Sequence, residues 1–434
     1  MDDLPDTMQA LVLAEEERVV YATVPCPRLL HPTDAIVKVT ACSVCGSDLH
    51  PYHGREKGIA PNTVVGHEFV GVVVAIGTEV TGLAVGDRVA SPFTSCCGDC
   101  FYCRKGATCR CNHAQAHLFG WVSEAEEQLP PEQRRGLQGS QAQYVRVPLA
   151  ASTLVQLPAD VSDEAGLLLG DILSTAFFCA ERGELGEGAA VAVLGCGPVG
   201  LLCVMAARHL GAGRVFAVDS VPERLAVAAE LGATPLRLAP PQSQQPPSQQ
   251  PQPQQPQGGQ VQSRDQPPQE SSEDGGVGSS WEGPEAAVVA AVREATEGRG
   301  ADCVLEAVGA NSALRLAYEL VRPMGTISSV GVNTSPSFPF SPVDAYNKNV
   351  TLRSGRCPAR AYMTRLMPLL REPAAPSFGA ASGACSLAGT HQRPALPWRR
   401  IFTHRLPLSR GAEAYDMFAR RAEGCIKVVL DPWV

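Results

Sequence analysis

The sequence predicts an α/β protein in which a small all-β barrel precedes a parallel sheet that helices cover on both faces. Residues 8–90 contain short runs rich in Val, Thr and Gly, separated by turn residues, as in a small barrel. From about residue 187, strand and helix patterns alternate, which is typical of a doubly wound parallel sheet. A glycine-rich turn at residues 195–200 follows the first of these later strands.

In the first part of the chain, strands are expected at residues 10–13, 35–39 and 71–77, where apolar and β-branched residues gather. Residues 92–113 form a cysteine-rich lobe within this part of the chain. We therefore predict that residues 8–185 form one domain and that the lobe is inserted in it.

In the second part, strands are expected at 190–194, 214–218 and 302–307, with a helix that follows the glycine turn and ends near His209. These elements predict a second domain at residues 186–331. The remaining segment, residues 332–434, ends with a helix near 410–421 and a strand at 426–430.

Two segments interrupt this pattern. Residues 240–284 are dominated by Pro, Gln, Ser and Gly, and residues 371–399 are rich in Ala, Ser, Gly and Pro. The first segment cannot bury enough apolar surface to offset the entropy lost on ordering, so we expect it to be disordered. We interpret it as a tolerated surface insertion, with a polyproline ligand for a partner as the alternative.

Composition narrows the class of protein. The formal net charge of −8 argues against nucleic acid or an anionic membrane surface as the main partner. The first residues lack the basic and apolar regions of a secretory signal, and the uncharged stretch at 191–207 is shorter than the roughly 20 apolar residues of a spanning helix. A cytoplasmic protein with reduced thiols is the expected class, although the chain has 16 cysteines.

Four cysteines, Cys97, Cys100, Cys103 and Cys111, have the spacing C-x2-C-x2-C-x7-C. Four thiolates in a tetrahedron are a preferred ligand set for zinc, and the spacing brings the sulfurs together around tight turns. Because no position is left open, the site is predicted to be structural. Unpaired thiols or disulfides are the alternatives, as is a set in which Cys96 replaces Cys97.

A second, open metal site is predicted from Cys45, in the run 45–50, and His67, in the run 66–68. A catalytic zinc needs a third protein ligand, and Asp171 is a charged residue within an apolar run. The alternative for Asp171 is a helix N-cap. Glu68 is a candidate fourth ligand or base, with a salt-bridged surface glutamate as the alternative. Asp48 is expected to orient a ligand histidine.

The run Gly-Cys-Gly-Pro-Val-Gly at 195–200 carries the dinucleotide-binding pattern G-x-G-x-x-G after a strand and before a helix. An acidic residue, Asp219, ends the next predicted strand and is expected to accept hydrogen bonds from the ribose. A carboxylate there repels a 2′-phosphate, so NAD is favoured over NADP. The turn residues expected to meet the cofactor are Gly195, Gly197, Pro198, Val199 and Gly200.

Taken together in this order, the motifs at 45–50, 66–68, 86–89, 195–200 and 300–309 and the four-cysteine lobe resemble the zinc-containing medium-chain dehydrogenase/reductase family. The resemblance implies a GroES-like barrel as the catalytic domain, a Rossmann domain, and a C-terminal segment that returns to the catalytic domain.

The run Asp-Ile-Leu-Ser-Thr at 171–175 and the run at 141–148 are similar to the branch with glutathione-independent formaldehyde dehydrogenases and secondary alcohol dehydrogenases. The family also implies that Lys427 lies near the pyrophosphate. Ala176 stands where the family usually has glycine, which would place an additional methyl group near the nicotinamide.

The resemblance implies a zinc-dependent oxidoreductase that transfers a hydride between an alcohol and NAD, with two zinc ions per chain. Zinc is expected to lower the pKa of the alcohol. Ser47 would accept its proton, and a relay through the cofactor ribose to His50 would carry the proton to solvent. The expected partner is a small alcohol or carbonyl compound, and the expected assembly is a homodimer or homotetramer.

Two other functions are compatible with this scaffold. One is a zinc-free enzyme like the quinone reductases, and the other is a non-catalytic nucleotide-binding protein that uses residues 240–284 to bind partners. The intact metal and glycine motifs argue against both. The sequence does not specify which alcohol or aldehyde is the substrate.

Overall fold

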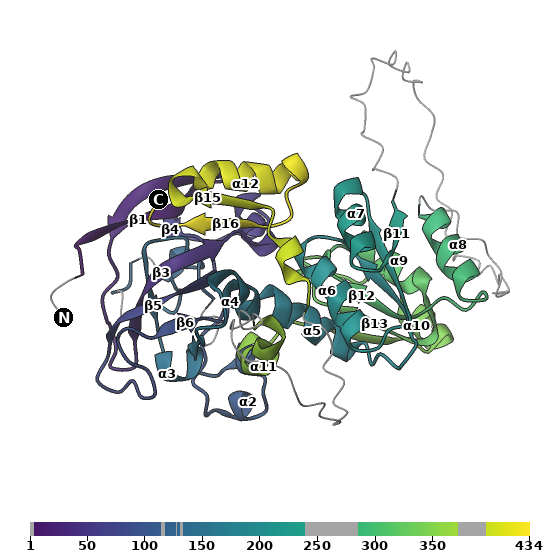
Figure 1. The fold of residues 1–434 in the computed structure, drawn as a ribbon, viewed down its shortest axis with the longest axis horizontal. Helices are drawn as coiled ribbons and strands as arrows, with labels where there is room; N and C mark the ends of the chain where they lie inside the picture. Colours follow the sequence, from purple (N-terminus) through teal and green to yellow (C-terminus); the bar gives the residue numbers. More distant parts are fainter. Residues whose placement is uncertain (1–3, 114–117, 127, 131–132, 239–284, 372–395) are drawn as a thin grey trace, which may run out of the picture.

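The computed structural model describes residues 4–113, 118–126, 128–130, 133–238, 285–371 and 396–434, which form two lobes (Figure 1). One lobe is built on an antiparallel barrel and the other on a parallel sheet. The predicted insertion at 240–284 and most of the irregular stretch at 371–399 lie outside the described residues, so the disorder expected for 240–284 stays a prediction. The predicted domain boundaries likewise stay predictions.

The barrel lobe contains a seven-stranded sheet and a smaller three-stranded sheet. The larger sheet runs β15-β16-β3-β5-β6-β8, with β7 also paired to β3, and the smaller one runs β2-β1-β4. The strands are β1 (Thr7–Glu15), β2 (Arg18–Pro25), β3 (Ala35–Ser43), β4 (Thr63–Val64), β5 (Glu68–Ile76), β6 (Arg88–Ala90), β7 (Tyr144–Val147), β8 (Val155–Gln156), β15 (His404–Pro407) and β16 (Val428–Asp431).

The end of the chain completes this barrel. Strand β16 pairs antiparallel with β3, with Val429 opposite Ser43, and β15 pairs with β16. Figure 1 shows these C-terminal strands in yellow beside the purple N-terminal strands. Helix α12 (Gly411–Arg420) packs on the same lobe, where Tyr415 is fully buried. Residues more than 350 positions apart in sequence are therefore neighbours in this lobe.

The second lobe is a six-stranded, wholly parallel sheet with the strand order β11-β10-β9-β12-β13-β14. Its central strands are buried on both faces, so they read as continuous apolar runs such as Ala-Val-Ala-Val-Leu in β9. The strands are β9 (Ala190–Leu194), β10 (Arg214–Asp219), β11 (Thr234–Arg237), β12 (Ala301–Glu306), β13 (Val321–Ser329) and β14 (Thr351–Ser354).

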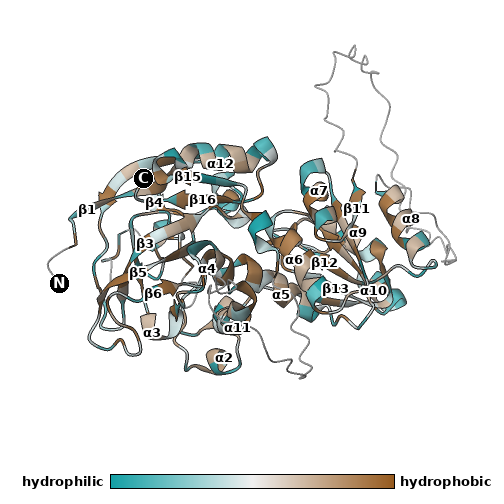
Figure 2. Ribbon diagram, viewed as in Figure 1, coloured by the Kyte–Doolittle hydropathy of each residue, from teal (hydrophilic) through white to brown (hydrophobic). Residues whose placement is uncertain are grey.

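The strand order reverses between β9 and β12, which is the arrangement of a Rossmann fold, and ligands bind at the carboxyl ends of the strands at that point. Figure 2 shows apolar residues along the strands and polar residues on outer surfaces such as that of α7. The helices of this lobe are α6 (Pro198–His209), α7 (Pro222–Glu230), α8 (Ala286–Ala295), α9 (Asn311–Leu320) and α10 (Pro342–Lys348).

The two lobes are joined by α4 (Asp163–Gly170) and α5 (Ile172–Arg182), which follow one another with only Asp171 between them. One apolar core runs from Val70 in the barrel through both helices to Val193 in β9. This packing holds the break between the helices at a fixed place beside the barrel. The remaining helices are α1 (Leu49–Tyr52), α2 (Phe101–Arg104), α3 (Ala150–Thr153) and α11 (Ala359–Leu366).

Among the described residues, no helix combines the length and the apolar character that crossing a bilayer requires.

The glycine turn after β9 provides a test of this fold. A Cβ atom on Gly200 would lie 1.7 Å from the carbonyl oxygen of Gly195, whereas one on Gly197 would meet only Arg224 at 3.7 Å. We predict that Gly200→Ala destabilises the protein by about 1–3 kcal/mol, the usual cost of overpacking, and that Gly197→Ala does not. Thermal unfolding followed by circular dichroism measures the difference, and equal midpoints for the two variants would contradict the described turn.

Candidate metal and cofactor site

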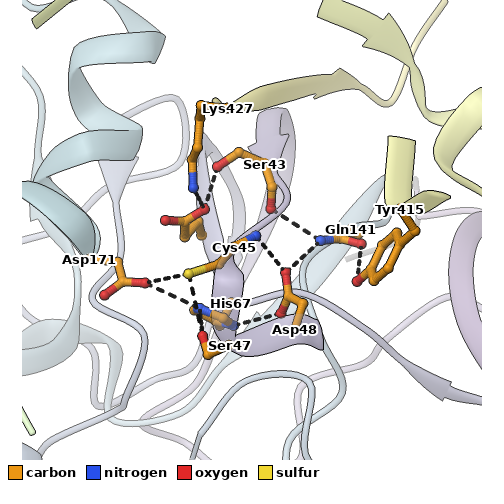
Figure 3. Close-up of polar contacts among 10 residues, drawn as sticks. Ser43, Cys45, Ser47, Asp48, His67, Gln141, Asp171, Tyr415 and Lys427 are labelled. Carbon is orange, nitrogen blue, oxygen red and sulfur yellow. Dashed lines mark hydrogen bonds and ion pairs between the residues drawn. The ribbon is translucent and has the colours of Figure 1, made fainter. Parts of the chain in front are cut away.

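Three side chains from distant parts of the sequence converge beside the barrel (Figure 3). Cys45 precedes a short helical turn, His67 precedes β5, and Asp171 separates α4 from α5. The Cys45 thiol donates to Oδ2 of Asp171 at 3.4 Å, and Nε2 of His67 lies 3.2 Å from the same oxygen. One ligand atom from each residue lies within 4.8 Å of the others. The structure thus brings together the three residues of the predicted open site.

Asp171 occupies the N-cap position of α5, but its side chain makes no capping hydrogen bond. Its second oxygen, Oδ1, instead accepts a hydrogen bond from Oγ1 of Thr175 at 3.3 Å. Burial opposes ionisation of Asp171, but the hydrogen bond and charge of His67 outweigh burial and hold the pKa of Asp171 below its usual range. The helix-cap alternative therefore describes the backbone position of Asp171 and not the use of its carboxylate.

The imidazole of His67 is held from its other side by Asp48. Nδ1 of His67 lies 3.0 Å from Oδ1 of Asp48, as the sequence predicted for a ligand histidine. Oδ2 of Asp48 accepts hydrogen bonds from the backbone N–H of Cys45 at 2.9 Å and from Nε2 of Gln141 at 3.2 Å. Tyr415 donates in turn to Oε1 of Gln141 at 3.0 Å. This buried chain of hydrogen bonds fixes the orientation of the imidazole, so that Nε2 of His67 points toward Cys45 and Asp171.

Glu68 and Lys427 form a buried ion pair next to these three residues. Oε2 of Glu68 accepts from Lys427 and, at 2.6 Å, from Oγ of Ser43. Within the described part of the chain, Oε1 of Glu68 is buried and has no hydrogen-bond partner. Burial lowers the pKa of Lys427, but the charge of Glu68 more than compensates and raises it. The amine of Lys427 is thus engaged by Glu68, and its predicted place near a pyrophosphate stays a prediction.

The residues present fit a catalytic zinc ion. A thiolate, an imidazole nitrogen and a carboxylate oxygen are zinc ligands, and catalytic sites use three of them and leave a fourth position open. The unpartnered oxygen of Glu68 lies in the same buried group of charges, which is consistent with its predicted role as a further ligand or base. A cation would also neutralise the buried carboxylates, which are costly without a partner.

The four predicted cysteines of the other site also cluster. The sulfur atoms of Cys97 and Cys103 lie 4.0 Å apart, as do those of Cys100 and Cys111. Tetrahedral zinc–sulfur bonds place sulfurs about 3.8 Å apart, so the spacing fits one ion. Positive φ angles of Gly98 and Gly106 permit the turns between the ligands.

The thiol of Cys96 lies outside this set, because it faces the carbonyl oxygen of Ser152 at 3.5 Å. Hydrogen bonds from backbone N–H groups, first that of Asn112, lower the pKa of Cys100 to about 6, which favours the thiolate that binds a metal.

A cavity of about 870 Å³ lies between the lobes and joins the open site to the glycine turn. Cys45, His67 and Asp171 line it, and so do all five turn residues that were predicted to meet the cofactor. Asp219 also lines the cavity, and its carboxylate accepts from the backbone N–H of Cys196 at 2.6 Å and of Val221 at 2.9 Å.

Ser47 and His50, the predicted proton-transfer residues, line the same cavity. Oγ of Ser47 lies 3.3 Å from the sulfur of Cys45 and 3.2 Å from Nε2 of His67, so it is adjacent to the ligand atoms. Nδ1 of His50 is buried without a hydrogen-bond partner among the described residues. Burial is the largest influence on His50 and lowers its pKa.

Comparison with known proteins agrees with this arrangement. Residues 31–159 match the family model of the alcohol dehydrogenase GroES-like domain, and residues 198–241 and 281–372 match that of the zinc-binding dehydrogenase. The chain is 40% identical over 348 residues to the medium chain reductase/dehydrogenase ucsI of an Acremonium species, covering 79% of this chain and 99% of that protein.

A second relative is the zinc-type alcohol dehydrogenase B of Aspergillus flavus, 34% identical over 84% of this chain and 73% of its own length. Among solved structures, alcohol dehydrogenase TADH from Thermus sp. ATN1 superimposes with a TM-score of 0.73 at 36% identity, covering 98% of this chain and 99% of that one. On the strength of its fold, its two ligand clusters and these relatives, the chain belongs to the zinc-type alcohol dehydrogenases of the medium-chain dehydrogenase/reductase family.

Proposed function

We propose that this protein is an NAD-dependent zinc alcohol dehydrogenase that binds two zinc ions per chain. The observation that carries the proposal is that the open ligand set of Cys45, His67 and Asp171 and the glycine turn line one cavity. A substrate that reaches the ligand set is then next to the place where a nicotinamide cofactor binds in a Rossmann fold. We further propose that Asp171 as third ligand places the chain near the formaldehyde and secondary alcohol dehydrogenases.

When bound, zinc supplies Lewis acidity that lowers the pKa of the substrate hydroxyl. The hydroxyl of Ser47, adjacent to the ligand atoms, is placed to accept the proton that the substrate loses. His50 lines the same cavity, burial lowers its pKa, and its Nδ1 has no hydrogen-bond partner among the described residues; we propose that it passes that proton to solvent. Asp48 and Gln141 orient His67 from behind and take no direct part.

Asp219 supports NAD over NADP. One of its carboxylate oxygens accepts the backbone N–H of Cys196 in the glycine turn and the other accepts that of Val221, which fixes a negative charge where the adenosine ribose binds. This charge would repel the 2′-phosphate of NADP. The proposed substrates are small alcohols and the corresponding carbonyl compounds, and the proposed assembly is a homodimer or homotetramer.

The proposal predicts NADH formation from alcohols and a specific loss of metal in ligand variants. Wild-type protein should reduce NAD with at least one member of a panel of primary, secondary and polyhydric alcohols, and metal analysis should find two zinc ions per chain. Cys45→Ser should abolish activity and retain one zinc. Cys97→Ser should lose the other zinc, whereas the control Cys96→Ser should keep both. Two zinc ions in Cys45→Ser would reject the ligand assignment.

Removing the Ser47 hydroxyl tests the proton-transfer role. Because general acid–base groups contribute about 10²–10⁴-fold to rates, Ser47→Ala should lower kcat by at least about 100-fold. The variant should retain both zinc ions and bind NADH as the wild type does. Ser47→Thr, which keeps a hydroxyl, should recover part of the activity. Unchanged turnover in Ser47→Ala would show that the hydroxyl is only structural.

The hydrogen-bond chain behind His67 predicts a graded effect on metal binding. Groups that orient a ligand histidine typically contribute 10–100-fold to metal affinity, so Asp48→Asn should weaken zinc binding at the open site by about that factor. Gln141→Leu should cause a smaller loss. Its control is Gln143→Leu, since Gln143 bonds to Gln9 and Pro432 and not to Asp48. Competition with a chelator measures the affinities, and equal affinity in Gln141→Leu and Gln143→Leu would contradict the role of Gln141.

A further inference from the structure

Two arginines from different lobes line the same cavity, on segments that contact each other. Arg110 ends the short helical turn Thr108–Arg110 of the cysteine-rich lobe, and Arg356 lies just after β14 of the parallel sheet. The thiol of Cys109 donates to the carbonyl oxygen of Arg356 at 3.3 Å, which ties the two segments together. Both arginines are exposed, and both line the cavity that contains the open ligand set.

Neither arginine has an acidic partner in the described part of the chain, where no ion pair involves either of them. The acidic residues that line the cavity are Asp48, Glu56, Asp171 and Asp219. Asp48 and Asp171 contact His67, and Asp219 accepts backbone N–H groups. The charge of Glu56 acts to raise the pKa of His50. Three of these four carboxylates are therefore engaged by other contacts, whereas the guanidinium groups of Arg110 and Arg356 form no ion pair in the described part of the chain.

The wall between these arginines and the metal ligands is apolar. The ring of Phe93 packs edge-on against the ring of His67, with centroids 6.4 Å apart. Phe93 belongs to an apolar cluster with Cys357, which follows Arg356, and Leu118 packs against that cluster. All three line the cavity. A molecule with its hydroxyl at the ligand set would thus place an apolar chain along this wall and its far end at the arginines.

We propose that the substrate is an alcohol that carries an anionic group, a carboxylate or a phosphate, at the far end of an apolar chain, and that Arg110 and Arg356 bind this group. The proposal rests on the proposed alcohol dehydrogenase function and adds the substrate class. Guanidinium groups present several N–H donors in a fixed plane that matches carboxylate and phosphate oxygens. Two of them at one rim favour an anion over the neutral end of a simple alcohol.

The test compares three substrates of equal chain length over a series of lengths: an ω-hydroxy acid, the phosphate monoester of the corresponding diol, and the simple primary alcohol. The zinc-loaded enzyme should show a kcat/KM at least about tenfold higher for one of the anionic substrates, and which one identifies the preferred anion. Because hydrogen bonds between charged groups are strong, Arg110→Ala and Arg356→Ala should each lower that value about 10–100-fold. Values for the simple alcohol should change by less than about threefold.

The matched control is Arg104→Ala. Arg104 lies in the same cysteine-rich lobe and is exposed, but it is paired with Asp99 at 3.7 Å and does not line the cavity. This variant should behave as the wild type with all three substrates. Equal losses for charged and neutral substrates in the Arg110 and Arg356 variants, or a raised KM for NAD, would show that these arginines serve the cofactor or the fold, and would overturn the proposal.

A binding measurement separates this proposal from the proposed function. The ω-methoxy acid of the preferred length has no hydroxyl to oxidise, and calorimetric titration measures its binding to the zinc-loaded protein. It should bind the wild type and Arg104→Ala equally, and Arg110→Ala and Arg356→Ala at least about tenfold more weakly. If no alcohol is oxidised but this pattern appears, the proposed function fails and the anion site stands. Equal binding to all four proteins overturns the anion site whatever the activity.

Discussion

The site depends on the burial of several acidic groups around one point. Cys45 and the carboxylates of Asp171 and Glu68 are all buried there, and Lys427 is the buried cation paired with Glu68. Burial first, and then the charges of Glu68 and Asp171, raise the pKa of the Cys45 thiol. A divalent cation reverses this effect, because it binds the thiolate and removes its proton. The grouping of these residues is therefore costly by itself and favourable around a metal ion, which links the stability of this region to metal binding.

The fold brings these groups together by holding two of the three ligands, His67 and Asp171, at the ends of different rigid elements. His67 directly precedes β5, which lies in the middle of the barrel sheet. Asp171 lies at the break between α4 and α5, and the continuous core from Val70 to Val193 keeps that break in place. Because neither ligand lies on a long free loop, little conformational entropy is lost when they coordinate a metal. The same helices connect the two lobes, so the ligand set and the glycine turn share one cavity.

Sequence reasoning was most successful where the chemistry is local. The four cysteines and the glycine turn lie within short segments, and the strand Ala190–Leu194 was predicted with its observed bounds. The family and the fold class are confirmed by the comparisons. For Asp171, the sequence left a metal ligand and a helix cap open, because both place an acid at the start of an apolar helix. Only the three-dimensional position of the carboxylate, without a capping bond, distinguishes the two.

The supporting contacts were not predictable in the same way. Tyr415 and Gln141 are separated by 274 residues, and no periodicity connects them. The signal available for Lys427 was a charge within an apolar strand, which indicates a buried partner but does not name Glu68.

These long-range contacts also explain why the C-terminal segment belongs with the site. Lys427, just before β16, and Tyr415 in α12 lie on different sides of the ligand set (Figure 3), where Lys427 compensates Glu68 and Tyr415 supports Gln141. Breaking either contact leaves a buried polar group without its partner, which costs more than the contact contributes when intact. The last strand of the barrel thus completes the polar surroundings of the ligands, and the first and last parts of the chain must pair before the site is whole.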